Sequence, residues 1–437
     1  MNVYLASVGC KLNQSEAETL ARKLSACGHR VVSDPVEADT IILNTCTVTH
    51  IAARKSGQLV RRLHRANTDA QIVLTGCFAE MSPDDAAALP GVRAVVGNAD
   101  KERLLERLGF CASTAGGSSG RHVPLSSALR TRAFVKIQDG CDNECTYCIV
   151  RIARGRQRSR GKDDIIAEIQ QRVSAGYQEV VLTGVHIGAY GRDHNQTAGM
   201  GLWDLVYSIL QQTSTPRLRL SSIEPWDIAP QHLALWQDRR LCRHLHLPLQ
   251  SGSDVILARM KRHYTVREFA DTVEATRKLV PDMAITTDVI VGFPGETESQ
   301  FEETLRFVEA MQFSRVHIFP YSARPGTEAA AYPDQVSPEV RQVRAQRLAE
   351  IAQASERAFW QRFLGQTVEV LWESRREAQV WSGLTDHYVR VMARSEKDLH
   401  NRITSAHITG LAPKGLWGEL LVSADRLETD SPDCKPG

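Results

Sequence analysis

"GCDNECTYC", residues 140–148, places Cys141, Cys145 and Cys148 in a C-x₃-C-x₂-C pattern directly after "AFVKIQ" (133–138), an apolar run that predicts a strand. A structural zinc site needs four closed ligands, but the next histidine downstream is His186. Three thiolates with no neighbouring fourth ligand fit an iron–sulfur cluster in which one iron stays open to an exogenous ligand. The alternatives are a zinc site completed by a distant ligand and three buried structural thiols.

Composition limits the class of protein. The 437 residues predict two or three domains, and the shares of hydrophobic residues (42%) and charged residues (24%) are those of a soluble globular protein. No apolar run approaches the roughly 20 residues that span a bilayer, and the N-terminus shows no signal peptide. We therefore expect a cytoplasmic protein with no membrane contact, whose cysteines are reduced thiols rather than disulfides. A net charge of +2 means that nucleic-acid contacts require local basic patches.

The first part of the chain, residues 1–112, alternates short apolar runs with helical patterns, which predicts a mostly parallel α/β sheet covered on both faces. In its first helix, Asn13 is the expected N-cap and Gly28 the expected stop. Residues 113–130 include "STAGGSSG" and are interpreted as a flexible linker. The predicted strands are "VYLASV" (3–8), "TIILNT" (40–45), "QIVLTG" (71–76) and "AVVG" (94–97).

The second part, residues 131–364, contains six strand-like runs separated by helical patterns. About six such units predict a partial (β/α)₆ barrel rather than a closed barrel of eight units. A long helix closes this part at 337–365. Residues 365–430 change to period-two patterns that predict a small β-barrel. With two strand–helix series before it, the overall fold class is predicted to be α/β. The six runs are 133–138, 179–184, 217–222, 243–249, 283–293 and 315–322.

A second set of cysteines shares one kind of position. Cys10, Cys46 and Cys77 each follow the carboxyl end of a predicted parallel strand, in "LASVGC", "IILNTC" and "IVLTGC". Such ends meet at one edge of an open α/β sheet, where ligand-binding crevices occur. The three thiols therefore predict a second iron–sulfur cluster in which one iron has no protein ligand. The alternative is a structural role, because small buried residues are also common at strand ends. The structural reading suits the other cysteines, which lack this placement: Cys27, Cys111, Cys242 and Cys434.

Several motifs together resemble the methylthiotransferase family of radical-SAM enzymes, in the family's order and over essentially the whole chain. They are "GCKLNQSEAE", "NTCTVT", "TGCFAE", "GCDNECTYCIV", "RGRQRSR", "SSIEP", "LHLPLQSGSD" and "VGFPGETE". The resemblance implies two [4Fe-4S] clusters, one on Cys141, Cys145 and Cys148 that binds S-adenosylmethionine, and an auxiliary one on Cys10, Cys46 and Cys77 that carries the sulfur to be methylated and donated. It also implies that the C-terminal barrel is an RNA-binding TRAM domain. The family commonly has Pro where this chain has Arg151, which puts only the local loop shape in doubt.

The resemblance also suggests S-adenosylmethionine contacts. The family places the ring of Tyr147 against the adenine, and the predicted barrel strand ends carry the other candidates, where such sites lie. These candidates are Gly184, Glu224, Gln250 and Ser251. Three histidines are expected to be hydrogen-bonded residues at strand ends rather than metal ligands: His186, His244 and His246.

The family acts on tRNA adenosines that carry an isopentenyl or a threonylcarbamoyl group, or on a ribosomal-protein aspartate. "LTGVHIGAYG" (182–191) most resembles the threonylcarbamoyl branch. The implied reaction is methylthiolation of C2 of the anticodon-adjacent adenosine, where the C–H bond is too unreactive for acid–base chemistry and an adenosyl radical is needed. The partners are then the tRNA anticodon loop and a reducing protein such as flavodoxin or ferredoxin. A non-catalytic iron–sulfur RNA-binding protein is the alternative from another class.

The RNA reading has support in the residues themselves. A run of arginines without intervening acidic residues follows the cysteine loop, and its density fits phosphate contacts or, alternatively, a solvated basic loop. Aromatic residues in the C-terminal part could provide a stacking platform, although core packing explains at least half of them. The arginines are Arg151, Arg154, Arg156, Arg158 and Arg160, and the platform candidates are Trp372, Trp381, Tyr388 and Arg390.

Overall fold

The computed structural model describes residues 1–111, 131–193, 200–377 and 379–421. The chain divides into two compact units, residues 1–359 and 360–437. The first unit contains both the N-terminal sheet and the second series of strands. The linker predicted at 113–130 lies outside the described residues, and the domain boundaries within the first unit stay a prediction.

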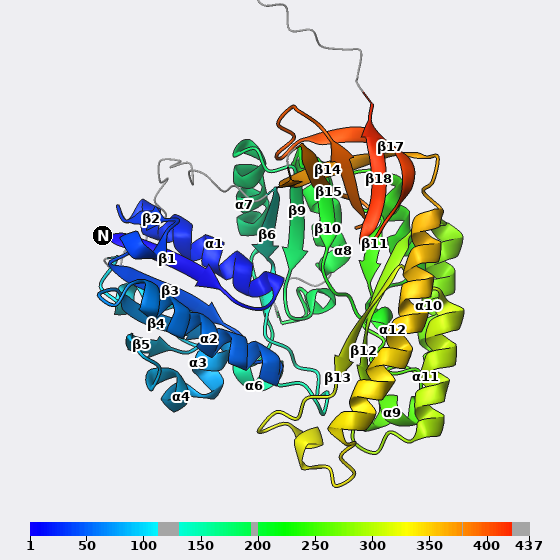
Figure 1. Ribbon diagram of the computed structural model, residues 1–437, viewed down its shortest axis with the longest axis horizontal. Helices are drawn as coiled ribbons and strands as arrows, with labels where there is room; N and C mark the ends of the chain where they lie inside the picture. The colour runs from blue at the N-terminus through cyan, green and yellow to red at the C-terminus, as the bar shows by residue number, and fades with distance from the viewer. Residues whose placement is uncertain (112–130, 194–199, 378, 422–437) are drawn as a thin grey trace, which may run out of the picture. The chain divides into compact units, whose positions relative to one another are not determined.

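The N-terminal sheet has five parallel strands in the order β2-β1-β3-β4-β5 (Figure 1). The four predicted strands are present, and β2 adds an edge strand that the sequence did not reveal. All six residues of β3 are buried, as its continuous apolar run requires. The strands are β1 (Asn2–Ser7), β2 (Arg30–Val32), β3 (Thr40–Thr45), β4 (Gln71–Gly76) and β5 (Val92–Val96). The helices are α1 (Lys11–Ala26), η1 (Pro35–Glu37), α2 (His50–Ala66), α3 (Cys77–Met81), α4 (Pro83–Ala87), η2 (Lys101–Arg103) and α5 (Leu104–Arg107).

Helix α1 ends as predicted but begins elsewhere. Gly28 follows its last turn with φ +81°, the left-handed conformation that glycine adopts without strain. The prediction that Asn13 is the N-cap was wrong, because the helix begins at Lys11 and Cys10 holds the N-cap position. The Asn13 side chain is buried and donates to the carbonyls of Val8 and Thr45. It therefore ties together the loops that carry Cys10 and Cys46.

The second series forms two three-stranded sheets, β10-β9-β6 and β11-β12-β13, joined by parallel bridges between Leu218 and Leu241 and between Ser222 and His246. The six strands are parallel, and within the described residues β6 and β13 do not pair, so the predicted partial (β/α)₆ barrel is confirmed (Figure 1). The strands are β6 (Arg132–Lys136), β9 (Glu179–Thr183), β10 (Arg217–Leu220), β11 (His244–His246), β12 (Ala284–Val291) and β13 (Arg315–Pro320), with a small ribbon of β7 (Gln138–Asp139) and β8 (Arg158–Ser159). The helices are α6 (Val150–Arg154), α7 (Lys162–Ser174), η3 (Ile187–Ala189), α8 (Leu202–Gln212), η4 (Pro225–Asp227), η5 (Pro230–Gln237), α9 (Asp254–Arg259), α10 (Val266–Leu279), α11 (Glu298–Met311), η6 (Glu328–Ala331) and α12 (Pro338–Gln361).

Strand β12 shows how this sheet separates its two faces. Ile285, Val289 and Val291 belong to the main apolar core together with residues of α10 and α11, such as Phe269 and Phe301. Because successive side chains of a strand alternate, Thr286 and Asp288 lie on the opposite face, away from these helices. Polar groups on that face can serve a binding site without disturbing the core.

The second unit is a closed five-stranded barrel in the order β14-β15-β16-β18-β17, which confirms the predicted small β-barrel. Trp372 is completely buried in it and donates from its indole nitrogen to Oγ1 of Thr404 over 2.8 Å. The strands are β14 (Thr367–Glu377), β15 (Val380–Thr385), β16 (Arg390–Arg394), β17 (Ile403–Ala412) and β18 (Gly415–Leu420).

Two cysteines depart from the expectation of reduced thiols throughout. Cys27, which follows α1, and Cys111, which follows α5, form a disulfide. The 84-residue separation hid this pairing in the sequence, because only the fold brings the two helix ends together. Cys242 is buried, as its structural interpretation predicts, and its thiol donates to Glu179 over 4.0 Å. Cys434 lies outside the described residues.

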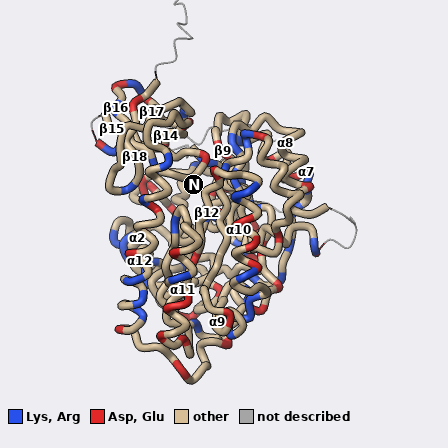
Figure 2. Tube along the Cα trace, turned by 90° about the vertical axis from the view of Figure 1, so that its right-hand side faces the viewer, with Lys and Arg blue, Asp and Glu red and all other residues tan. Residues whose placement is uncertain are grey.

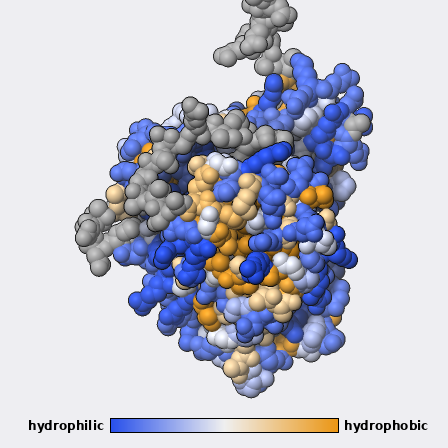
Figure 3. All heavy atoms as spheres, turned by 90° about the vertical axis from the view of Figure 1, so that its left-hand side faces the viewer, coloured by the Kyte–Doolittle hydropathy of each residue, from blue (hydrophilic) through white to orange (hydrophobic). Residues whose placement is uncertain are grey.

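Basic and acidic residues are interspersed over the face that contains α9 to α12 (Figure 2). On the side where the N-terminal sheet lies, apolar surface gathers in the middle of the face and hydrophilic surface surrounds it (Figure 3). Among the described helices, none combines the length and apolar character that a membrane crossing needs.

Candidate functional site

The loop that carries Cys141, Cys145 and Cys148 leaves the ribbon strand β7 and enters α6. Gly140 begins it with φ +68°, and a Cβ atom there would lie 2.0 Å from the carbonyl oxygen of Arg156, so the turn requires glycine. The backbone amide of Cys141 donates to Gly155, and that of Thr146 donates to Met260 at the end of α9. The loop is therefore held by hydrogen bonds from both sides, which fixes where the thiols lie.

Arg262 is the cation beside this loop. Its Nη1 donates to Sγ of Cys145 over 3.4 Å, and its Nη2 donates to a carboxylate oxygen of Glu224. The guanidinium also lies over the rings of Trp226 and Tyr264, at 5.3 and 5.1 Å from their centroids. A buried guanidinium that donates to sulfur stabilises a thiolate, because it offsets part of the negative charge.

His186, which follows β9 and precedes η3, supports the same loop. Its Nε2 lies 2.7 Å from Oδ2 of Asp227, whose other oxygen accepts from Arg192. Burial lowers the pKa of His186, but hydrogen bonds with Asp227 and Cys141 outweigh burial and raise the pKa to about 9. The ring is therefore protonated at neutral pH and adds a second positive group beside the cysteine loop. His244 and His246 both contact Thr286, so all three histidines make hydrogen bonds, which confirms that part of the prediction. The expectation that they are not metal ligands stays a prediction for His186 and His244.

Cys10, Cys46 and Cys77 come together at one edge of the N-terminal sheet. They follow β1, β3 and β4, which are neighbours in the sheet. Gly9 has φ +110°, and a Cβ atom there would lie 2.8 Å from Sγ of Cys46, so this backbone passes directly against the thiol. The strand order is the doubly wound one in which a ligand crevice lies between β1 and β3. The sheet therefore presents all three thiols at such a crevice.

Both triads have the donor set that an iron–sulfur cluster needs. All six cysteines are free thiols. Burial and, to a smaller extent, the neighbouring cysteines raise the pKa of Cys46 to about 11 and that of Cys148 to about 12. Without metal these two groups are neutral thiols at pH 7, and a metal must displace their protons to bind. Thiols that raise one another's pKa fit a site that is stabilised when iron offsets the negative charge of the thiolates.

A buried ionic network joins the two triads. Glu16 of α1 accepts from Lys101 over 2.7 Å and from Arg154 over 2.9 Å. Arg154 also donates to Asn13, over 2.6 Å, and to Asp139, over 2.9 Å. Burial would raise the pKa of Glu16, but Lys101 and Arg154 hold it well below its usual range. Because α1 begins beside Cys10 and α6 follows Cys148, the network connects the two loops.

The predicted S-adenosylmethionine contacts fall into two groups. Glu224 and Gln250 are partly exposed at the ends of β10 and β11, and Tyr147 packs on the apolar cluster of Met260 and Phe293. Gly184 lies against Gln138. The side-chain oxygen of Gln138 accepts from the backbone amides of Val185 and His186. The Ser251 prediction does not fit, because this residue is fully buried and its hydroxyl lies 3.4 Å from that of Thr304 on α11.

The predicted RNA contacts also divide. Arg156 and Arg158 are exposed, as phosphate contacts require, and Arg160 pairs with Glu168. Arg154 is buried in the network with Glu16 and is unable to reach a phosphate, which corrects that prediction.

In the second unit, the platform residues are mostly structural. Trp372 and Trp381 are buried in the barrel, so neither can stack on a base, and the Trp381 prediction is corrected. Tyr388 and Arg390 are partly exposed, and Arg390 donates to Ser382.

Sequence reasoning missed the residues that surround the cysteine loops. Arg262 and Asp227 lie far from the loop in sequence, and no spacing signals their roles. Arg324 likewise donates to Oγ1 of Thr47, next to Cys46, over 2.6 Å. Only the fold brings these groups to the thiols, so a pattern in one segment could not have found them.

Two family models match separate segments of the chain. The model described as "Radical SAM superfamily" matches residues 135–308, which include Cys141, Cys145 and Cys148. The model described as "Uncharacterized protein family UPF0004" matches residues 2–97, which include Cys10, Cys46 and Cys77. Each thiol triad therefore lies within one matched segment.

Similar proteins match over nearly the full length. The threonylcarbamoyladenosine tRNA methylthiotransferase MtaB of Bacillus subtilis is 36% identical, and the match covers 93% of each chain. The protein of the same name from Thermotoga maritima is 37% identical over 98% of this chain and 99% of its own. The tRNA-2-methylthio-N(6)-dimethylallyladenosine synthase of Geobacillus thermodenitrificans is 34% identical over 95% and 83%.

Among solved structures, the radical S-adenosylmethionine methyltransferase TsrM from Kitasatospora setae is similar, with a TM-score of 0.56. The match covers 75% of this chain and 77% of TsrM at 14% sequence identity. At this identity the likeness shows a shared fold.

Removal of the Glu16 carboxylate is expected to destabilise the first unit. Glu16→Gln leaves Lys101 and Arg154 buried without their shared counter-charge, which costs about 3–5 kcal/mol of unfolding free energy. Urea denaturation of the apoprotein measures this loss. The control is Glu37→Gln, because Glu37 pairs at the surface with Arg30 and is expected to contribute under about 1 kcal/mol. Equal losses in the two variants would contradict a stabilising role for the network.

The same pair of proteins gives a pH test. An unfolded glutamate titrates near pH 4.3, whereas the pKa of Glu16 in the folded protein is well below that value. Glu16 therefore contributes full stability above about pH 4.3 and loses it as the pH falls further. The stability difference between wild type and Glu16→Gln should be constant from about pH 8 to 6 and should shrink below pH 4.3.

Proposed function

This chain belongs to the methylthiotransferase family of radical-SAM enzymes, and we propose that it adds a methylthio group to C2 of threonylcarbamoyladenosine next to the tRNA anticodon. Two observations together carry the proposal. The chain has two sets of three free cysteine thiols, each one ligand short of the four iron atoms of a cluster, and it is similar over nearly its full length to two MtaB proteins. Because the first unit contains both triads, sulfur supply and radical chemistry can take place within one compact unit.

The family's cofactors are S-adenosylmethionine and [4Fe-4S] clusters. We assign one cluster to Cys141, Cys145 and Cys148, and the auxiliary cluster to the triad at the edge of the N-terminal sheet. When bound, these cofactors supply a carbon radical and a sulfur atom, which the protein side chains lack. The protein binds and orients both groups.

The residues around the first triad have distinct tasks in this proposal. Arg262 donates toward Cys145 and holds the Glu224 carboxylate in place. Glu224 and Gln250, after β10 and β11, would contact the bound ligand, and Tyr147 would contact its adenine. Ser251 acts indirectly, because its buried hydroxyl accepts from the backbone amide of Ser253 and shapes the loop after Gln250.

The substrate is the anticodon loop of a tRNA, which places the enzyme in the cytoplasm. Arg156 and Arg158 are exposed and follow the cysteine loop, and we assign them to phosphate contacts. Arg151 is also exposed, but it pairs with Glu144 of the loop. Arg390 of the C-terminal barrel is a further candidate. The reductant is a small electron-transfer protein such as flavodoxin or ferredoxin, because the family's chemistry consumes electrons.

The direct test uses anaerobically reconstituted enzyme, S-adenosylmethionine, a chemical reductant and tRNA that carries either threonylcarbamoyladenosine or isopentenyladenosine. Mass spectrometry of the digested nucleosides should show a methylthio product only with the first tRNA. Cys10→Ala should still cleave S-adenosylmethionine but yield no methylthio nucleoside. A product only with isopentenyladenosine would overturn the substrate assignment, and no product with either tRNA would overturn the function.

Arg262 is expected to matter for S-adenosylmethionine cleavage. Arg262→Leu removes the guanidinium 3.4 Å from Cys145, so the rate of S-adenosylmethionine cleavage should fall by at least about tenfold, equivalent to ~1.4 kcal/mol. Liquid chromatography of 5′-deoxyadenosine measures the rate, and iron content reports whether the cluster remains. Arg267→Leu, at an exposed site on α10, is the control. Unchanged cleavage in Arg262→Leu would contradict its assigned role.

The arginines after the cysteine loop should contribute through charge. Replacement of both Arg156 and Arg158 by alanine should weaken tRNA binding and reduce the slope of log K against log salt by about 1–2. Fluorescence anisotropy over a range of salt concentrations gives this slope. The matched control replaces Arg103 and Arg107, which are exposed on η2 and α5. An identical slope in both double variants would exclude the proposed phosphate contacts.

A further inference from the structure

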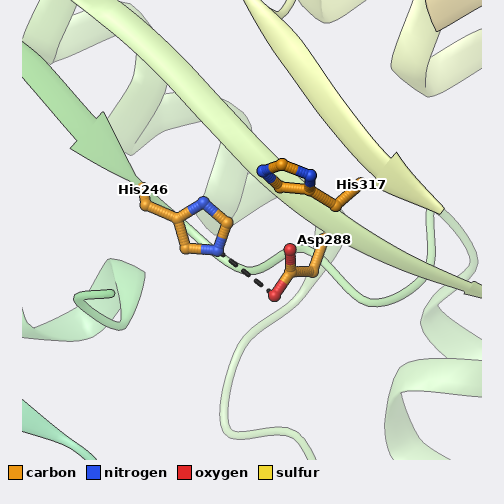
Figure 4. Close-up of side chains that lie close together, drawn as sticks. All are labelled: His246, Asp288 and His317. Atoms are coloured by element: carbon orange, nitrogen blue, oxygen red, sulfur yellow. Dashed lines mark ion pairs between the residues drawn. The ribbon is translucent and has the colours of Figure 1, made fainter. Parts of the chain in front are cut away.

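Two imidazoles and one carboxylate lie together on the sheet β11-β12-β13, and none of them belongs to either thiol triad. They are His246 of β11, Asp288 of β12 and His317 of β13 (Figure 4). One potential ligand atom from each residue lies within 4.8 Å of the other two. Nε2 of His246 is 3.2 Å from Oδ2 of Asp288.

The register of the sheet produces this cluster. Asp288 pairs directly with His317, and His246 pairs with Thr286, two residues before Asp288. Because side chains two residues apart share a face, all three groups project from the face that is turned away from α10 and α11. Three neighbouring strands in one hydrogen-bonded sheet thus hold the donors, and no loop is involved.

Thr286 sets the orientation of the His246 ring. Its Oγ1 lies 2.9 Å from Nδ1 of His246 and 3.0 Å from Nε2 of His244. When Nδ1 of His246 carries the proton, it donates to the Thr286 hydroxyl, which in turn donates to Nε2 of His244. Nε2 of His246 then keeps a lone pair on the side of Asp288. A hydrogen bond of this kind on the far nitrogen is what orients histidine ligands in metal sites.

We propose that His246, Asp288 and His317 form a binding site for a divalent transition-metal ion such as Zn²⁺. Imidazole nitrogens favour such ions over Mg²⁺ and Ca²⁺, which prefer oxygen-only sites. Bonds of about 2.0–2.2 Å bring donor atoms to roughly 3–4 Å from one another, so small side-chain rotations complete the site. The side chains of His246 and Asp288 are 12% and 28% exposed, which lets an ion enter.

Three protein donors leave at least one coordination position for water or for an oxygen atom of a ligand. The site therefore differs in kind from a structural zinc centre, in which four protein donors fill every position. It differs from the thiol triads in its donor atoms as well. The proposal concerns a nitrogen and oxygen site and does not rest on the proposed function.

The test uses the full-length holoenzyme with both clusters assembled, freed of excess iron and incubated anaerobically with Zn²⁺. We expect one zinc per chain beyond the clusters, and zinc X-ray absorption should show only nitrogen and oxygen neighbours, including imidazole. His317→Ala and Asp288→Asn should each weaken zinc binding by at least about 100-fold, and Thr286→Val by about tenfold. His400→Ala, at an exposed histidine of the second unit, should leave binding unchanged.

Three results would overturn the proposal: no additional zinc in the holoenzyme, sulfur neighbours around the bound zinc, or equal zinc affinity in wild type and His317→Ala. Retained cluster absorption in each variant shows that the protein is folded, so weaker binding then reports the site itself. Since no tRNA or S-adenosylmethionine is present, the result is independent of methylthiolation.

Discussion

The ion pair between Glu16 and Arg154 is the contact on which the arrangement of the first unit depends. Glu16 lies on the helix that begins beside Cys10, and Arg154 lies on the helix that follows Cys148, so one buried contact spans 138 residues of sequence. Its charges are satisfied by Lys101, Asp139 and Asn13 rather than by water. A buried pair of this kind is costly to break because each partner would be left without compensation. It therefore fixes the distance between the two sites that the chemistry has to connect.

The fold was largely predictable because its strongest signals are local. Buried parallel strands appear as continuous apolar runs, and six such runs predicted the open barrel that the structure contains. The short edge strand Arg30–Val32 has too few residues to produce a pattern. The cysteine loops were also predictable, since Cys141, Cys145 and Cys148 form a compact motif and the other triad repeats one position after three strands.

The environment of the site was less predictable, and the errors share a cause. Arg154 belongs to an arginine run that suggests RNA contact, yet it is buried against Glu16. Trp381 and Ser251 were chosen for their chemistry, but both are buried in the fold. A linear pattern shows which residues are chemically able to act, whereas exposure depends on partners that lie far away in sequence. The same reason explains why Arg262 and the Cys27–Cys111 disulfide were not anticipated.

Within the described residues β6 and β13 do not pair with each other, which has a consequence for which molecules the first unit can process. A cylinder closed by eight strands can be entered only through its ends, so its guest must be small enough to arrive untethered. A sheet that stops at six strands has a flank that no further strand closes. Helix α1 covers the β6 side, where the amide of Lys136 donates to Oγ of Ser15, whereas within the described residues β13 pairs with β12 alone. A single residue of a long polymer, still joined to its neighbours on both sides, can then approach sideways, and neither end of the polymer has to be threaded through.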